Sequence, residues 1–204
     1  MKLIGMSDSP FVRRVAISAK RLGLSFEHEQ ISVMRQFEAF SAFNPLVKAP
    51  TLITDDGTVL MESTVIVEYL EKLAGPDKTL FPEALSDFVK GQRVIGLALI
   101  ACEKTVQIVY EYNMRPADKL HPDWLTRVET QLGEAYSALN KELEGLSAFL
   151  GGDEPTQADI TAACAWGFTR LVYPNLADLA TYPAIAALSK QAEALPEFIS
   201  TPLV

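Results

Sequence analysis

The hydrophobic pattern of this chain changes near residue 80, and this change constrains the fold more than any other feature of the sequence. Before it, short apolar runs of strand length alternate with helical runs; after it, apolar residues recur at helical spacing almost throughout. A mixed segment followed by a helical one is typical of two separate domains. We predict an α/β domain at residues 1–77, a linker at 78–85 and an all-helical domain at 86–204.

The first domain is predicted to contain a four-stranded mixed sheet with helices on its faces. Asp55, Asp56 and Gly57 provide a tight turn between the last two strands. We expect strands at residues 2–6, 26–31, 51–54 and 59–61, and helices at 11–22, 35–43 and 63–74.

The second domain is predicted to be a helical bundle. Pro122 suits the first turn of a helix, and Thr156 with Asp159 has the spacing of a capping box. No segment of this half of the sequence has the alternation that is typical of a strand. We expect helices at residues 86–112, 122–150, 156–171 and 183–194.

Charge and composition exclude several classes of function. The 204 residues include 18 Lys and Arg against 26 Asp and Glu, a net charge of −8, so nucleic acid is not an expected partner. Apolar residues make up 49% of the chain, which is too many for a disordered protein. The longest uncharged stretches reach only about half the length of a bilayer span, so no membrane segment is expected.

The N-terminus and the cysteines predict the compartment. The first six residues are too short for the apolar core of a signal peptide. Cys102 and Cys164 both lie in apolar helical runs, which suits buried thiols in a reducing compartment better than a disulfide. We therefore expect a cytoplasmic protein.

The residue inventory argues against several catalytic schemes. His28 and His121 are the only histidines, and neither has a Cys or His at the spacing of metal ligands, so no metal site is expected. The sequence lacks the glycine-rich loops that bind nucleotide phosphates and the G-x-S-x-G motif of serine hydrolases. The remaining candidates lie at the ends of the predicted strands.

Three short motifs flank predicted strands. Ser9 and Pro10 have the residue types of a helix start, with a capping hydroxyl and a proline at the first helical position. This pattern indicates either a simple cap or a site where the helix N-terminus favours an anion such as a thiolate. The other two motifs are Lys48-Ala49-Pro50 before the third strand and Glu62-Ser63 at the start of the helix that closes the domain.

Together these motifs resemble those of the cytosolic glutathione transferase superfamily, in its serine-type bacterial-like branch. The resemblance covers essentially the whole chain. It implies a thioredoxin-like first domain, an all-helical second domain, an active site in the cleft between them, glutathione as co-substrate, and a homodimer. It rests on Ser9-Pro10-Phe11, Asn44-Pro45, Lys48-Ala49-Pro50, Glu62-Ser63 and Thr156-x-x-Asp159.

The resemblance also implies a role for each matching residue. Ser9 would donate a hydrogen bond to the glutathione thiolate. Ser7 is the alternative, because some serine-type branches place the serine where this chain has Asp8, and a shift of one residue brings in Ser7. The implied glutathione contacts are Glu62 to the glutamyl amine, Ser63 to the glutamyl carboxylate, the Ala49 backbone before a cis Pro50 to the cysteinyl part, and Lys48 to the glycyl carboxylate.

The acceptor pocket is predicted mainly on the helical domain. Aromatic and methionine side chains suit an apolar electrophile, and Arg115 suits an anionic one. Core packing explains Met114 and Trp166 equally well, and this alternative stays open. The predicted pocket residues are Phe11, Tyr110, Met114, Arg115 and Trp166.

The predicted function is that of an enzyme, a homodimeric cytoplasmic glutathione transferase of the detoxification type. It would stabilise the thiolate of glutathione and conjugate it to a small electrophile, with peroxidase or isomerase side activities open to the same site. The alternative is a protein of the same fold that binds ligands or other proteins without catalysis.

Overall fold

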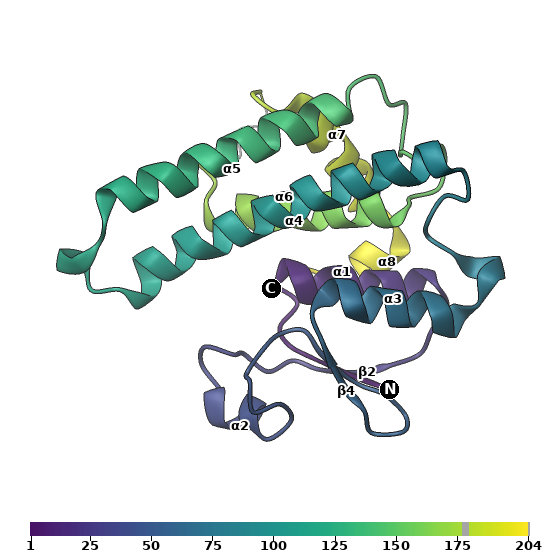
Figure 1. Cartoon of the computed structure of the whole chain (residues 1–204), viewed down its shortest axis with the longest axis horizontal. Helices are drawn as coiled ribbons and strands as arrows, with labels where there is room; N and C mark the ends of the chain where they lie inside the picture. The colour runs from purple at the N-terminus through teal and green to yellow at the C-terminus, as the bar shows by residue number, and fades with distance from the viewer. Residues whose placement is uncertain (177–179, 204) are drawn as a thin grey trace. The chain divides into compact units, whose positions relative to one another are not determined.

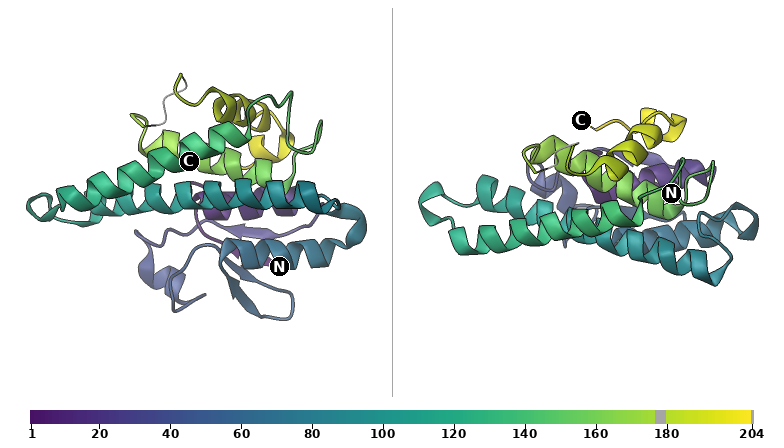
Figure 2. Two further views of the ribbon diagram at one scale, coloured as in Figure 1. Left: turned by 45° about the horizontal axis from the view of Figure 1, so that its top comes forward. Right: turned by 90° about the horizontal axis from the view of Figure 1, so that it is seen from above.

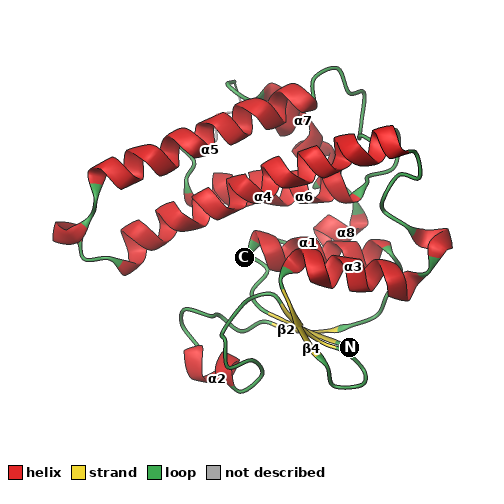
Figure 3. Ribbon diagram, viewed as in Figure 1, coloured by secondary structure: helices red, strands yellow, loops and turns green. Residues whose placement is uncertain are grey.

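The computed structural model describes residues 1–176 and 180–203 and divides the chain into two compact units. The first unit comprises Met1–Leu80 and the C-terminal segment from Ala194, and the second comprises Phe81–Glu193. The boundary after residue 80 falls inside the linker predicted at 78–85. Figure 3 shows the strands gathered in the first unit and helices filling the second, so the predicted combination of an α/β and an all-helical unit is confirmed.

A four-stranded mixed sheet forms the centre of the first unit, as the sequence predicts. Its strands, each three residues long, are β1 (Lys2–Ile4), β2 (Glu27–Glu29), β3 (Thr51–Ile53) and β4 (Val59–Met61). Their order is β2-β1-β3-β4, with β1 parallel to β2 and β3 antiparallel to both β1 and β4. The first three strands are shorter than predicted; β1 stops where Gly5 takes a φ of 137°, a conformation that favours glycine.

Three helices cover this sheet. In Figure 1, α1 (Pro10–Arg21) and α3 (Ser63–Ala74) lie side by side over one face, and the short α2 (Phe37–Ser41) lies toward the other. The start of α3 is as predicted, whereas α2 is shorter than the predicted helix at 35–43. Phe40 of α2 is fully buried and packs in one cluster with Ile4 of β1, so α2 and its flanking loops are held to the sheet.

Helices α4 (Leu85–Met114), α5 (Pro122–Glu142), α6 (Gln157–Val172) and α7 (Pro183–Ala192) make up the second unit. Figure 2 shows α4 and α5 as long antiparallel neighbours, joined at one end by a short segment that contains the turn η2 (Ala117–Lys119). No helix within residues 1–176 and 180–203 is both long and apolar enough to cross a bilayer.

Helix α5 ends at Glu142, so the prediction that it reaches residue 150 is wrong. The chain turns at Gly145, whose φ of 78° favours glycine. Beyond the turn, Asp159 Oδ1 accepts the Leu150 N–H at 2.9 Å and its Oδ2 accepts the Thr156 N–H at 2.8 Å. The predicted capping box is therefore confirmed, and its carboxylate also fixes the loop that replaces the end of the predicted helix.

An aromatic cluster forms the centre of the helical unit. The ring of Trp166 lies 5.2 Å from that of Tyr136 and 6.0 Å from that of Tyr182, both in edge-on geometry. The Tyr136 hydroxyl is buried and donates to a backbone carbonyl of α6 at 3.0 Å. Cys102 and Cys164 are buried in the same unit, as predicted.

The C-terminal segment packs on the first unit, whereas the sequence places it in the helical domain at 86–204. Helix α8 (Pro196–Ile199) carries the buried Phe198, and the Arg13 guanidinium lies over its ring at 5.2 Å. Arg13 Nε also donates to the Thr201 carbonyl at 2.8 Å. A buried guanidinium is stable only with acceptors around it, and this segment supplies one from the far end of the sequence.

We expect Phe198→Ala to lower the free energy of unfolding by about 3 kcal/mol, because the substitution removes a buried ring and leaves a cavity. Ile199→Ala is the matched control, since Ile199 is 65% exposed on the same helix. The control is expected to change the free energy of unfolding by less than about 0.5 kcal/mol. Urea denaturation measures both variants, and equal losses would contradict the packing of this segment against the first unit.

Candidate functional site

The register of the sheet brings the predicted glutathione-contact motifs to one edge. β1, β2 and β4 run in the same direction, and β3 runs against them. Ile4, at the end of β1, is opposite Glu29 of β2 and Thr51 of β3, and Thr51 in turn is opposite Met61 of β4. The segments that continue from these residues therefore share this edge; they carry Ser7, Ser9, Lys48, Ala49, Pro50, Glu62 and Ser63.

The turn after β1 carries the two candidate serines in different surroundings. Ser9 caps α1, is half-buried, and its Oγ accepts the Val12 N–H at 3.4 Å. A hydroxyl that accepts in this way keeps its own proton free to donate. Ser7 is 2% exposed, and its N–H donates to Gln30 Oε1 at 3.1 Å. Of the two hydroxyls, that of Ser9 is the more accessible.

The loop before β3 is held by a buried asparagine. The Asn44 Nδ2 donates to Thr51 Oγ1 at 2.9 Å, and its Oδ1 accepts the Leu46 N–H at 3.0 Å. Thr51 Oγ1 donates in turn to the Lys48 carbonyl at 2.7 Å. The Ala49–Pro50 peptide bond is cis, as the resemblance implies. These bonds explain the Asn in the sequence motif, because it fixes both ends of the loop.

Glycine is required where this loop meets the turn after β1. A Cβ built on Gly5 would lie 3.2 Å from the Ala49 Cβ and 2.6 Å from a methyl of Val12. Ala49 therefore lies directly against the start of the Ser7 to Ser9 turn. The close approach gives Gly5 a second reason to be glycine, besides its backbone conformation.

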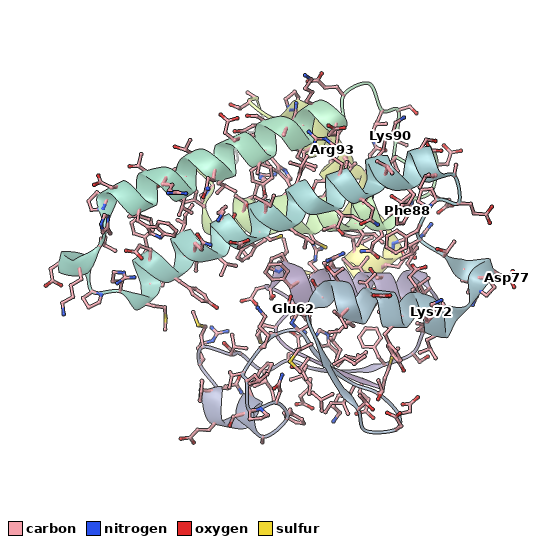
Figure 4. The ribbon with its side chains drawn as sticks, in the orientation of Figure 1. Glu62, Lys72, Asp77, Phe88, Lys90 and Arg93 are labelled. Atoms are coloured by element: carbon pink, nitrogen blue, oxygen red, sulfur yellow. The ribbon has the colours of Figure 1, made fainter. Side chains whose placement is uncertain are left out.

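The start of α3 has the features of an anion site. Glu62 precedes Ser63 with φ 70° and ψ 118°, a left-handed conformation that is uncommon for a residue with a side chain. The first N–H groups of a helix have no partner within the helix and attract anions. Figure 4 shows Glu62 at this end of α3.

Glu62 and Lys48 pair with each other across the edge. Their Oε1 and Nζ atoms are 3.1 Å apart, and both side chains are more than half exposed. Exposed pairs of this kind contribute only about 0–1 kcal/mol. A ligand that offers a cation to Glu62 and an anion to Lys48 therefore displaces the pair at little cost.

Arg14 is a site residue that sequence reasoning missed. Its guanidinium is buried on α1, and Nη1 donates to Ser63 Oγ at 3.2 Å and to Thr64 Oγ1 at 3.3 Å. Arg14 thus joins α1 to the first turn of α3 and leaves the Ser63 proton free for an anion. The available signal was the pair of arginines between the apolar residues Val12 and Val15.

The predicted acceptor residues lie in three different environments. Tyr110, Met114 and Arg115 line one open pocket of about 510 Å³ at the end of α4. Trp166 is 1% exposed in the aromatic cluster described above, so the packing alternative holds for it, and it does not line this pocket. Phe11 lies half-buried on α1, in the first unit.

A buried carboxylate organises this pocket. Glu111 is 5% exposed; its Oε1 accepts from Arg115 Nε at 2.8 Å and from the His121 N–H at 3.2 Å. Burial alone raises the pKa of Glu111, but the hydrogen bonds from Arg115 and His121 outweigh it and lower the pKa overall. Across residues 1–176 and 180–203, no three His, Cys, Asp or Glu side chains are grouped to hold a metal ion.

His28 of β2 links the sheet to the turn after β1. Its Nε2 lies 2.9 Å from the Gly5 carbonyl, an atom that only accepts, so this nitrogen carries the proton. Burial lowers the pKa of His28, and the bond to Gly5 opposes this shift only in part. The imidazole thus supports the turn in its neutral form.

We expect the protein to lose stability as the pH falls below 6.5, the ordinary pKa of histidine. Because folding lowers the pKa of His28, the unfolded chain binds the proton more readily than the folded chain. The contribution of neutral His28 to the free energy of unfolding is therefore complete above pH 6.5 and is lost as the pH falls toward the pKa of the folded state. His28→Gln keeps an N–H donor and removes the titration. Urea titrations from about pH 7.5 to about pH 5.5 should show that the free energy of unfolding depends less on pH in the variant than in the natural protein. An identical pH dependence in both proteins would contradict the role of His28.

Comparisons with known proteins agree with this geometry. Residues 3–78 match the N-terminal domain of glutathione S-transferases, and residues 122–190 match their C-terminal domain. The uncharacterized GST-like protein YibF of Escherichia coli K12 is 29% identical over 168 residues, which are 82% of this chain and 81% of YibF. A Methylobacterium radiotolerans glutathione S-transferase, solved with glutathione sulfonate, superposes with a TM-score of 0.89 at 28% identity, over 98% of this chain and 93% of the other.

A second solved structure, a glutathione S-transferase from Methylobacillus flagellatus with glutathione bound, gives a TM-score of 0.88 at 25% identity, over 100% of this chain and 99% of the other. Both halves of the sequence thus match the two domains of one family in the same order. Since both domain models match and the fold agrees with the solved structures, the chain belongs to the glutathione S-transferase family.

Proposed function

We propose that this protein is a glutathione transferase that binds glutathione at the sheet edge, stabilises its thiolate and conjugates it to a small electrophile. The observation that carries the proposal is the convergence of the capped start of α1, the cis Ala49–Pro50 loop and the Glu62-Ser63 start of α3 at one edge. The glutathione bound in the similar bacterial structures supports it.

The charged groups of glutathione suit the groups at this edge. Its glutamyl amine would bind Glu62, and its glutamyl carboxylate would bind the Ser63 hydroxyl and the free N–H groups of α3. Its glycyl carboxylate would bind Lys48, so the ligand exchanges the exposed pair of Lys48 and Glu62 for two new pairs. The backbone of Ala49 would bind the cysteinyl part.

Ser9 is proposed to stabilise the thiolate. A free thiol has a pKa of about 8.5 and is only a few per cent ionised at neutral pH. The Ser9 O–H and the positive end of α1 both favour the anion, and lowering the thiol pKa by one unit takes about 1.4 kcal/mol. The thiolate lone pair then forms the carbon–sulfur bond, and the leaving group departs with its bonding electrons.

The electrophile is proposed to bind the helical unit at the pocket lined by Tyr110, Met114 and Arg115. The Tyr110 ring and the Met114 thioether offer an apolar surface, and the pocket volume of about 510 Å³ suits a small molecule. We also propose that the protein acts in the cytoplasm, where thiols such as the buried Cys102 and Cys164 stay reduced.

We expect Ser9→Ala to lower turnover with a chlorodinitrobenzene acceptor by about 100- to 1,000-fold, as for the loss of one donor to a reacting anion. Glutathione affinity should change little, because the charged ends of the ligand keep their contacts. Ser7→Ala is the matched control, since its hydroxyl lies in the same turn but is buried. Ultraviolet absorbance of the bound thiolate, measured beside turnover, should fall in Ser9→Ala alone.

Other outcomes of this experiment separate the alternatives. A larger loss in Ser7→Ala would transfer the role to Ser7. Glutathione binding without thiolate absorbance in the natural protein would favour a ligand-binding protein that performs no conjugation. Full turnover in Ser9→Ala would remove Ser9 from the mechanism.

We also propose a homodimer. Leu85, Phe88 and Val89 follow the i, i+3, i+4 spacing of one helix face and are 75%, 37% and 58% exposed, so they form an apolar stripe on the first turns of α4. Figure 4 shows Phe88 on the side of α4 opposite Lys90 and Arg93. A second copy of the chain would cover this stripe.

Val89→Glu is expected to shift the protein from dimer to monomer in sedimentation velocity, because it places a charge in the proposed contact. Tyr112→Glu is the control, since Tyr112 is 50% exposed on the same helix and, by helical spacing, lies on a different face from Val89. A monomeric natural protein, or an equal shift in both variants, would contradict the proposed dimer contact.

A further inference from the structure

We propose that Gln30 is the positioning residue that presents Ser9, rather than Ser7, to the thiol of bound glutathione. Gln30 directly follows β2, outside every motif that the sequence analysis singled out. Its Oε1 accepts the Ser7 N–H at 3.1 Å, from a position 23 residues further along the chain. The inference rests on the proposed function, because it names the group that orients the proposed thiolate donor.

The turn after β1 is held mainly by β2 and the residue that follows it. The Gly5 N–H donates to the Glu29 carbonyl at 3.0 Å, and the Gly5 carbonyl accepts from His28 Nε2 at 2.9 Å. One residue further on, the backbone has left the sheet, and the Gln30 side chain supplies the next hydrogen bond, to Ser7. Gln30 thus attaches the turn to β2 beyond the point where the sheet ends.

The bond from Gln30 matters because Ser7 is buried. Ser7 is only 2% exposed. A buried N–H without an acceptor is strongly unfavourable, so loss of the Gln30 oxygen would shift the turn until Ser7 reached water. An amide side chain accepts only through its oxygen, and the bond therefore also fixes which way the Gln30 amide faces.

The position of Ser9 depends on this turn more than on its own capping bond. Ser9 Oγ accepts the Val12 N–H at 3.4 Å, which is longer than an ordinary hydrogen bond. The Ser9 N–H donates back to the Met6 carbonyl at 3.2 Å. Met6 directly precedes Ser7, so a shift of Ser7 also moves the group that holds Ser9. The direction of the Ser9 hydroxyl therefore follows from the bond between Gln30 and Ser7.

The same bond decides which of the two serines meets the thiol. With its N–H held by Gln30, Ser7 is buried, whereas Ser9 is half-buried at the start of α1. The charged ends of glutathione are proposed to bind at the start of α3 and in the loop before β3. Loss of the Gln30 oxygen should therefore change the ionisation of the thiol and leave glutathione affinity nearly intact. A general loss of structure would weaken binding as well.

Gln30→Met removes the accepting oxygen and keeps the length of the side chain. We expect it to lower turnover with chlorodinitrobenzene by about fivefold to tenfold, with the KM for glutathione unchanged. The pH at which the bound thiolate reaches half its maximal ultraviolet absorbance should rise by about 0.7 to 1, because the same loss of stabilisation acts on the anion. Gln30→Glu keeps an accepting oxygen and places its charge on an exposed residue, so turnover should stay within about twofold.

Gln36→Met is the matched control. Gln36 is also exposed, and its Oε1 accepts the Ser32 N–H at 3.1 Å, so the same kind of bond is lost in another loop. This variant should keep the turnover and thiolate absorbance of the natural protein. Hydrogen exchange of the Ser7 amide should become faster in Gln30→Met alone, and this measurement needs neither glutathione nor activity.

A double-mutant cycle tests whether Gln30 acts through Ser9. In a Ser9→Ala background, Gln30→Met should lower turnover by less than about twofold, because the hydroxyl that it orients is absent. In a Ser7→Ala background it should keep its full effect. Equal factors in the two backgrounds, full turnover in Gln30→Met, an unchanged exchange rate of the Ser7 amide, or equal losses in Gln36→Met would each overturn the proposal.

The thiolate absorbance of the natural protein separates this inference from the proposed function. Glutathione binding without thiolate absorbance would overturn both the proposed transferase and the role of Gln30. Normal thiolate absorbance in the natural protein and in Gln30→Met would overturn the role of Gln30 alone.

Discussion

The antiparallel placement of β3 in the middle of a mixed sheet is the constraint on which the candidate site depends. Because β3 opposes its neighbours, its first residue lies beside the last residues of β1 and β4. Loops that are more than fifty residues apart in sequence thus meet at one edge. A slip of one residue in this register would move Thr51, and with it the loop that Asn44 and Thr51 hold together.

Buried charged groups provide the next level of organisation. Arg13 fixes the C-terminal segment, Arg14 joins α1 to the start of α3, Asp159 fixes the loop after α5, and Glu111 joins α4 to α5. Removal of one partner from such an arrangement leaves a buried charge uncompensated, which is strongly destabilising. In each case the charge connects two segments that hydrophobic packing alone would leave less well defined.

The two units provide different kinds of chemistry. The sheet edge of the first unit offers helix starts, hydroxyls and backbone groups, whose positions follow from the fold. The tip of α4 and α5 offers exposed side chains such as Lys119 and Trp124, which substitutions change without disturbing the core. Family membership therefore says more about the sheet edge than about the tip of α4 and α5, since a shared fold does not specify which substrate binds beside the first one.

Features that local interactions control can be predicted from the sequence. Each helix start depends on residues within four positions of one another, as at Ser9, Ser63 and the capping box of Asp159. The spacing of apolar residues also shows which face of a strand or helix is buried. The cis Ala49–Pro50 bond was expected only through resemblance to known proteins. Three features depend on tertiary structure: the packing of residues 194–203 with the first unit, the burial of Trp166, and the grouping of Lys119 with Arg127 in one pocket. These depend on contacts between distant segments or on which side of a helix meets the core, and a pattern of neighbouring residues does not encode either.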